Sequence, residues 1–586
     1  MNIKNIIEEK LSEIILNVYQ LKEINLEVQE NKTEYEGDFT IVTFPLVKQL
    51  KKNPESIGVE LGESLTAQTN LLESFNVVKG FLNVKVKNQF FVDQFKSVSE
   101  GFSKIEKKNA TVMVEYSSPN TNKPLHLGHI RNNLLGFSVA QILKEAGYDV
   151  IKTQIINDRG IHICKSMLAW EKFGNGETPE TTHTKGDKFV GNYYVEFDKN
   201  YKKEIAELVE QGVGEDQAKK EAPMMKEAQK MLLDWENNDE TVRNLWNEMN
   251  SWVYKGFNET YKRLGVDFDQ VQYESNTYLL GKDLIQEGLD KGVLYQKEDG
   301  SVWCDLIDEG LDQKLLLRSD GTSVYMTQDL GTAVERFKQN DIQKLIYTVG
   351  NEQDYHFQVL FKIMKKLGYA WADQLFHLSY GMVELPNGKM KSREGTVVDA
   401  DDLMQEMYQT AKAITIELGK LEGLSEEEKE ASYEIIGQAA LKYFMLKVDP
   451  KKKMLFNPDE SVEFSGNTGP FIQYTYARIQ SLLSKAGYAQ KETEAVELNQ
   501  FQKELIMQLA NYKTVVEKAA EILSPALVAN YLYDLVKSYN SFYQNNPILI
   551  LEDENMKQFC LNLSDLTAKT IKKSLGLLGI GTVNRM

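Results

Sequence analysis

The chain has 586 residues, of which 42% are hydrophobic and 26% charged, and its formal net charge is −18. Such a mixture is ordinary for a globular protein with a sizeable core, and at roughly 100–200 residues per domain the length predicts three or more domains. The acidic balance argues against general affinity for nucleic acid, because phosphate binding rests on Lys and Arg, but it allows a local basic surface.

Neither a membrane span nor a structural metal site is expected. No run approaches the roughly 18 apolar residues that cross a bilayer. The opening stretch MNIKNIIEEKLSEII mixes charged and apolar residues and does not resemble a signal peptide, so we expect a cytoplasmic protein. Cys164, Cys304 and Cys560 are far apart and form no CxxC pair, which predicts reduced thiols and no zinc site.

Residues 1–105 are expected to form a separate α+β domain. A helical start is followed by the strand-like string FTIVTFPLV at residues 39–47, and then by a second helix that reaches Leu71. Gly80 to Val86 alternate apolar and polar residues as a final strand does, and Lys104 to Asn109 are a charged linker.

A βαβ unit opens the next domain, which we expect to cover residues 106–434. Thr111 to Tyr116 are strand-like, Ser117 to His129 form a polar loop, and Ile130 to Ala146 have helical apolar spacing. Asp149 to Ile156 are the second strand. These elements predict a parallel sheet with a ligand site at the carboxyl end of its first strand.

The later chain is expected to alternate between helices and short strands. Residues 162–310 are predicted to be a largely helical insertion, after which the sheet resumes. The strand candidates that follow are Ser323 to Met326, Lys344 to Val349 and Phe376 to Tyr380. Amphipathic helices from 435 to 586 predict an all-α helical bundle.

Pro124 to His129 (PLHLGH) lie between the first predicted strand and its helix. A helix N-terminus offers free N–H groups and partial positive charge to an anion. The imidazoles of His126 and His129 can donate hydrogen bonds to phosphate oxygens there, while Gly128 leaves room for a flat base. HxGH alone also fits two surface histidines beside a turn, but within a βαβ unit it predicts a nucleotide site.

The longer string VEYSSPNTNKPLHLGHIRNNLLG, from Val114 to Gly136, resembles the arginyl-tRNA synthetases, members of class I with its HIGH motif. Further segments resemble the same family: Ser323 to Gly331, Val349 to His356, Ala440 to Phe444 and Phe471 to Ile479. The resemblance implies a Rossmann-type catalytic domain, a tRNA-contacting N-terminal domain and a helical anticodon-binding domain. It also implies three substrates, ATP with Mg²⁺, L-arginine and the arginine tRNA, together with a monomeric enzyme that holds no metal of its own.

The resemblance assigns ATP to His126, Gly128 and His129 together with the second class I signature. That signature is degenerate here, at Lys389, Met390, Lys391 and Ser392, followed by Arg393. Ser392 stands where many class I enzymes carry a catalytic lysine, so Lys389, Lys391 and Arg393 remain candidates for the cation that meets pyrophosphate. Lys123 is a further candidate, because arginyl enzymes without the loop lysine tend to carry Lys at this place.

A guanidinium needs carboxylate acceptors in a fixed geometry. The resemblance gives this role to Asp329 and Glu115, and makes Tyr325 a wall with a hydroxyl. The remaining residues that it assigns to arginine are Ser117, Asn120, His129 and Gln353. Alternatives from the residues themselves are that Asp329 caps a helix beginning near Leu330 and that Tyr325 is a core aromatic. An unpaired carboxylate at Glu115, on an apolar strand, is costly, which favours a partner for it.

Tyr474, Tyr476 and Arg478 offer stacking surfaces for unstacked anticodon bases. Their spacing cannot place all three on one helical face, so at least one is expected in the core. The basic run from Lys447 to Lys453 either contacts phosphates or forms a solvated turn.

Other readings of the HxGH string make different demands. A cysteinyl enzyme of class I needs a zinc site for its thiol substrate, which the cysteines do not provide. A non-catalytic tRNA-binding paralogue is expected to lose the histidine pair or the substrate carboxylates. The small nucleotidyltransferases that use HxGH are far shorter than this chain.

Overall fold

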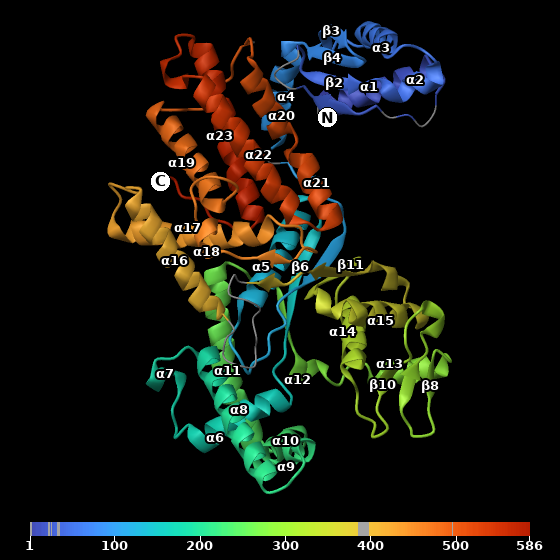
Figure 1. Ribbon diagram of the computed structural model, residues 1–586, viewed down its shortest axis with the longest axis vertical. Coiled ribbons are helices and arrows are strands. Elements are labelled where there is room, and N and C mark those ends of the chain that lie inside the picture. The colour runs from blue at the N-terminus through green and yellow to red at the C-terminus, as the bar shows by residue number, and fades with distance from the viewer. Residues whose placement is uncertain are drawn as a thin grey trace.

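The computed structural model describes residues 3–21, 24, 26–31, 36–102, 104–384, 398–494 and 496–586. In its N-terminal domain, α1 and α3 pack against a small antiparallel sheet of strand order β1-β2-β4-β3 (Figure 1). The strand expected at residues 39–47 ends at Val42, because Pro45 stands in the first turn of α2, where a missing N–H costs little. The elements are α1 (Ile3–Asn17), β1 (Val28–Glu30), β2 (Phe39–Val42), α2 (Phe44–Leu50), α3 (Pro54–Gln68), β3 (Leu72–Val78) and β4 (Phe81–Val86).

The central sheet of the described chain has five parallel strands in the order β12-β11-β5-β6-β7. Its strands and first crossover helix are β5 (Thr111–Glu115), α5 (Leu127–Glu145), β6 (Asp149–Ile156), β7 (Gln270–Tyr273), β11 (Lys344–Gly350) and β12 (Leu375–Tyr380). The predicted βαβ unit is confirmed, as are the strands at β11 and β12. Two expectations differ: the sheet already resumes at β7, inside the range expected as an insertion, and no strand covers 323–326, where α14 begins.

Two lobes extend from this sheet (Figure 1). The first is helical, with α6 (Ile161–Phe173), α7 (Pro179–Thr182), α8 (Gly186–Glu210), α9 (Glu215–Glu221), α10 (Pro223–Glu236) and α11 (Glu240–Leu264). The second carries an antiparallel sheet of order β10-β9-β8. Its elements are α12 (Glu274–Thr277), α13 (Lys282–Asp290), β8 (Leu294–Gln296), β9 (Val302–Cys304), η1 (Ile307–Glu309), β10 (Lys314–Leu317), α14 (Tyr325–Gln339), η2 (Asn351–Gln353), α15 (Asp354–Lys366) and η3 (Ala370–Gln374).

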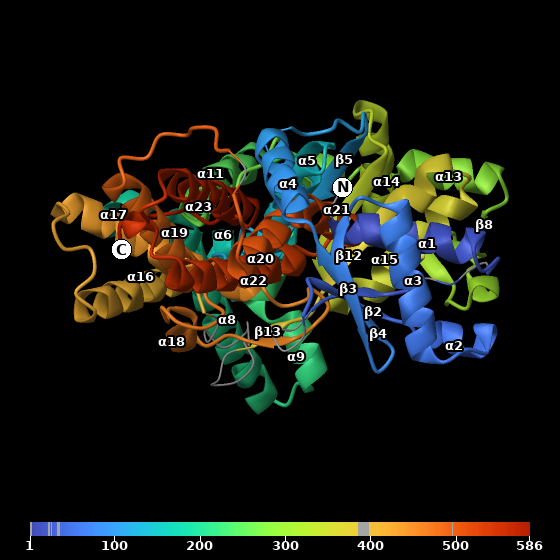
Figure 2. The same cartoon turned by 90° about the horizontal axis from the view of Figure 1, so that it is seen from above.

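Helices dominate the rest of the chain and lie beside the N-terminal domain (Figures 1 and 2). They are α16 (Ala400–Glu417), α17 (Glu426–Leu446), α18 (Pro458–Ser461), α19 (Gly469–Lys485), α20 (Gln500–Ala510), α21 (Tyr512–Ile522), α22 (Pro525–Asn545), η4 (Ile548–Ile550) and α23 (Glu554–Leu577), with a two-stranded pair, β13 (Val383–Glu384) and β14 (Met454–Leu455). The expected boundary between residues 434 and 435 falls inside α17.

Helix α5 is buried on both sides. One side lies on the sheet so closely that a Cβ at Gly136 would stand 2.3 Å from the Cβ of Tyr116. The other side packs against α17, α21, α22 and α23, and the hydroxyl of Ser138 donates to the carbonyl of Leu577 at 2.8 Å. The parallel sheet and the helical bundle therefore share one core.

Arg131 fixes the first turns of α5 to the chain beyond α17. Its buried guanidinium donates to the carbonyls of Pro450 at 3.1 Å and Lys452 at 3.0 Å. These carbonyls belong to the basic run, in which Lys451 and Lys453 are exposed. The end of the run is thus held by its backbone with its lysines exposed, whereas the ammonium of Lys447 at its start donates to the carbonyl of Asn467 at 2.9 Å.

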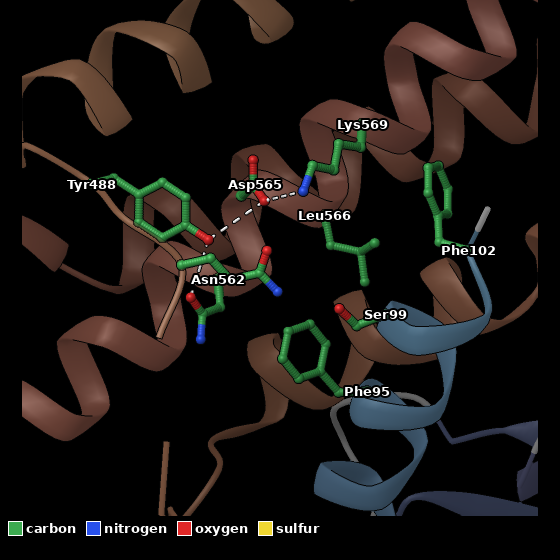
Figure 3. Close-up of a pocket in the computed structure, with 9 residues that line it drawn as sticks. Phe95, Ser99, Phe102, Tyr488, Asn562, Asp565, Leu566 and Lys569 are labelled. Carbon is green, nitrogen blue, oxygen red and sulfur yellow. Dashed lines mark hydrogen bonds and ion pairs between the residues drawn. The ribbon is translucent and has the colours of Figure 1, made fainter. Parts of the chain in front are cut away.

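A cavity of about 260 Å³ lies where α4 (Asn88–Gly101) meets α23 (Figure 3). Phe95 and Phe102 come from the N-terminal side, and the ion pair of Asp565 with Lys569, at 2.7 Å, comes from α23. The cavity marks the junction of two domains and contains none of the residues predicted to bind substrate.

No helix in the described part of the chain is both long and apolar enough to cross a membrane. The three cysteines are free and buried, and among the described residues no cluster of His, Cys, Asp or Glu is placed to hold a metal ion.

Candidate active site

The start of α5 fixes the two histidines in one tautomer. His126 is the N-cap, and its Nδ1 accepts a hydrogen bond from the backbone N–H of Gly128 at 3.2 Å. Nδ1 of His129 accepts from the backbone N–H of His126 at 3.1 Å. Because both Nδ1 atoms accept, each neutral ring carries its proton on Nε2. The ring centres lie 3.9 Å apart with the planes tilted by 39°, and the two rings offer neighbouring N–H donors beside a helix N-terminus.

Burial and a neighbouring cation keep these rings neutral. Burial, followed by the charge of Lys123, lowers the pKa of His126 to about 4. The pKa of His129 is also well below its usual value, through burial and then through His126 and Lys123. Neutral donors can therefore reach an anion over the whole neutral pH range.

Lys123 lies in the loop that leads to α5, and its charge is felt by both rings. Burial lowers the pKa of its amine. The loop is held against the helical lobe, since a Cβ at Gly191 would approach the Cδ of Pro124 to 2.9 Å. This placement supports Lys123 as a cation for the same anion that the histidines meet, a role that stays a prediction.

The second signature, with Lys389, Met390, Lys391, Ser392 and Arg393, lies outside the described residues. The chain that follows it is anchored beside the histidines. The backbone N–H of Leu127 donates to Val398 at 3.2 Å, and that of Ala400 donates to Leu125 at 2.9 Å. The segment after the signature therefore joins the chain on both sides of His126.

Asp329 and Glu115 both lie near the carboxyl edge of the sheet. Asp329 is in the second turn of α14, whose N-cap is Val324, so the capping alternative is wrong. Its Oδ2 lies 2.6 Å from Nε2 of His356. Glu115, the last residue of β5, is buried, and its carboxylate forms an ion pair with Arg336. The partner required by its burial is therefore present within the chain.

Tyr325 is 74% exposed at the start of α14, so the core-aromatic alternative is wrong. It lines a cavity of about 520 Å³ with Gln328, Arg159 and Glu274, next to the turn that holds Asp329. Burial raises the pKa of Glu274 to about 7. The cavity is thus walled by an aromatic ring and by groups of both charges.

Ser117 sits in the left-handed region at φ 63° and is already bonded within the protein. Its N–H donates to Oδ1 of Asn132 at 2.7 Å, and its hydroxyl lies 2.8 Å from that of Tyr261. Asn120 and Gln353 are exposed just beyond the ends of β5 and β11. Exposed amides at this edge can meet a ligand, whereas the Ser117 side chain first shapes the loop.

Sequence reasoning did not single out three residues of this site. Asn132 joins two strands, since its amide also donates to the carbonyl of Thr348 at 2.6 Å. His356 and Arg336 pair with the two carboxylates. Helical spacing from His129 to Asn132 and from Asp329 to Arg336 puts each pair on one face, which is the pattern that could have found Asn132 and Arg336.

Of Tyr474, Tyr476 and Arg478 in the bundle, the residue expected in the core is Tyr476, which is 4% exposed. Tyr476 is therefore withdrawn from the residues proposed to contact tRNA. Tyr474 and Arg478 are half-buried, with the guanidinium 4.9 Å from the ring centre, and Lys420 lies 4.1 Å from the same ring. The remaining pair therefore forms a basic aromatic surface.

Comparisons with known proteins cover the whole chain. Family models match in three parts: an arginyl tRNA synthetase N-terminal domain at residues 1–86, a class I (R) tRNA synthetase catalytic domain at 94–457 and a DALR anticodon binding domain at 472–586. A Flavobacterium psychrophilum protein named Arginine–tRNA ligase is 57% identical over 601 residues, with 100% of both chains covered. A Bacteroides thetaiotaomicron protein of the same name is 54% identical over 99% of this chain and 100% of its own.

Solved structures share the fold. The arginyl-tRNA synthetase of Thermus thermophilus superposes with a TM-score of 0.79 at 24% identity, covering 100% of each chain. The enzyme of Plasmodium falciparum gives a TM-score of 0.75 at 20% identity over 100% of this chain and 99% of its own.

Proposed function

The chain belongs to the arginyl-tRNA synthetase family, and from this premise we propose how its residues divide the reaction. The protein is an arginine–tRNA ligase: it activates L-arginine with ATP and transfers it to its tRNA. The observation that carries the division is the placement of two Nε2–H donors and two carboxylates near one edge of the sheet.

In the first step the arginine carboxylate attacks the α-phosphate of ATP, and pyrophosphate leaves. His126 and His129 donate to phosphate oxygens, with Gly128 giving the base room, while Lys123 and the cations Lys389, Lys391 and Arg393 meet the pyrophosphate. Positioning and charge stabilisation suffice for this displacement, so no protein nucleophile is needed. Met390 and Ser392 complete the nucleotide contacts.

Asp329 and Glu115 accept from the substrate guanidinium, and Tyr325 forms a wall beside it. Asn120, Gln353 and His129 hold the amino-acid end, with the Ser117 loop shaping that part of the pocket. The arginyl-adenylate then reacts with the terminal adenosine of tRNA, at its 2′-hydroxyl, and AMP leaves.

The proposal extends to partners. Residues 1–105 and 435–586 contact tRNA, with Tyr474 and Arg478 stacking on anticodon bases. Mg²⁺ arrives with ATP. We further propose a monomer that works in the cytoplasm, where charged tRNA is consumed.

An ATP–pyrophosphate exchange assay with a panel of amino acids tests the assignment. We expect exchange with arginine alone, and only when the tRNA is present, because arginyl enzymes as a family need it for activation. Robust exchange with cysteine or glutamate would contradict the proposal.

A further inference from the structure

Helix α14 carries an arginine, Arg336, on the same face as Asp329. Arg336 lies two turns after Asp329 and is 1% exposed. Its Nη1 donates to Oε2 of Glu115, and its Nε donates to Oε1 of Gln272 on β7 at 2.9 Å. Its guanidinium carbon stands 5.9 Å from the centre of the Tyr347 ring. Three strands therefore hold this buried guanidinium in one orientation.

The charge of Arg336 interacts with the charges of Glu115 and Asp329. Burial lowers the pKa of Arg336, but Glu115, Tyr347 and Asp329 act in the opposite direction, and the pKa ends above its usual value. Arg336 is thus a fixed cation within electrostatic reach of both carboxylates. Two carboxylates and one guanidinium leave a net charge of −1, which one bound guanidinium balances.

Glu115 presents its second oxygen because the first is occupied. Among the described residues a hydrogen bond reaches Oε2, from Arg336, and none reaches Oε1. The carboxylate is buried at the end of an apolar strand. A guanidinium has donors only, so the Oε1 that Arg336 leaves free is an acceptor for the substrate.

We propose that Arg336 is a positioning residue of the arginine site, which holds the Glu115 carboxylate by its Oε2 and so aims its Oε1 at the substrate guanidinium. The proposal rests on the arginine-binding role given to Glu115 above. Arg336 acts through Glu115 and does not touch the substrate. It therefore sets the affinity for arginine and leaves the nucleotide half of the site unchanged.

The test compares Arg336→Met, Arg336→Lys, Glu115→Gln and the double variant Glu115→Gln/Arg336→Met by steady-state aminoacylation. We expect Arg336→Met to raise the KM for arginine about ten- to hundredfold, the range of a lost charged hydrogen bond, with the KM for ATP within about twofold. Arg336→Lys keeps the charge without the fork and should recover several-fold of the loss. Arg263→Met is the control, because Arg263 bonds Glu434, Asp401 and Gln405, none of which is assigned to arginine.

The double variant tests whether Arg336 acts through Glu115. Because it removes both charges of the buried pair, it leaves no unpaired buried charge that could cause misfolding. Its KM for arginine should equal that of Glu115→Gln alone, because a residue that works through Glu115 adds nothing once that carboxylate is gone. Two results would overturn the inference. The first is a KM for arginine in the double variant that equals the product of the two single effects. The second is a wild-type KM for arginine in folded Arg336→Lys and Arg336→Met, while Glu115→Gln has a raised one. Failure of the proposed function looks different, since wild-type enzyme would then not use arginine at all.

Discussion

The N-terminal turns of α5 and α14 face one edge of the sheet, and they differ in the charge of their side chains. The start of α5 holds two neutral imidazoles whose pKa values burial has lowered. The start of α14 brings Asp329 close to the buried pair of Glu115 and Arg336. The first half offers aligned donors to phosphate oxygens, and the second offers acceptors and net negative charge to a guanidinium. Substitutions that remove a donor and substitutions that remove a charge should therefore separate the two halves.

The largest effect is expected at the start of α5. His129→Ala removes an N–H donor from the phosphates, and losing one such donor in a transition state costs about 10²–10³ in kcat. His129→Gln restores an N–H near the position of Nε2 and should recover part of the rate. Aminoacylation kinetics measure both, with His183→Asn as a control at an exposed helix end. A His129→Ala enzyme within about threefold of wild-type kcat would remove the histidines from the phosphate half.

Asp329→Asn probes the other half, with a smaller effect that concerns arginine. The change keeps shape but removes the charge that a guanidinium requires, so kcat/KM for arginine should fall about ten- to hundredfold while the KM for ATP stays near wild type. Asp373→Asn, which breaks the ion pair with Lys365 at 2.8 Å on α15, serves as the control. An unchanged KM for arginine in a folded Asp329→Asn enzyme would contradict the division.

Lys123 tests whether the phosphate half also needs a cation. Lys123→Ala should lower kcat about three- to tenfold and leave the KM for arginine nearly unchanged, because other cations share the leaving pyrophosphate. Placing lysine at Ser392 in that variant should restore part of the rate. Wild-type kcat in Lys123→Ala would return this role to Lys389, Lys391 or Arg393.

The remaining effect is on stability, which responds to acid. The pKa of His126 is about 4 in the folded chain and about 6.5 when unfolded. Above pH 6.5 neither state binds this proton, whereas between about pH 6.5 and 4 only the unfolded state does, so stability falls as pH falls. Urea unfolding near pH 7.5 and pH 5 should show wild type losing about 2 kcal/mol more than His126→Gln. Equal losses would mean that the ring is protonated in the folded enzyme.

The sequence pattern predicted the secondary structure correctly where it extends over many residues. The HxGH string, the strand before it and the helix after it carry apolar spacing that only one fold satisfies, and all three appear as expected. β7 was missed because its four residues, three half-buried and one exposed, have little apolar character and resemble the helices around them until β6 lies alongside. The start of α14 was taken for a strand because no side chain caps it, so Val324 and Tyr325 gave β-like propensity without a helix boundary.

The site was predicted in parts for a similar reason. Both histidines and both carboxylates stand in strings that local sequence makes visible. The ion pair of Glu115 with Arg336 spans 221 positions and exists only once β5, β7 and α14 come together. Charge compensation at such distances is a property of the folded chain, and no window of sequence contains it.

The burial of α5 between the sheet and the bundle has a consequence for synthesis. The helix that presents His126 and His129 accepts its last covering surface from α23, whose end at Leu577 receives the Ser138 hydrogen bond. A ribosome therefore has to translate through α23 before the catalytic helix can pack completely. Nascent chains and prematurely terminated products lack this packing, so we expect them to be unable to activate arginine and to be susceptible to proteolysis.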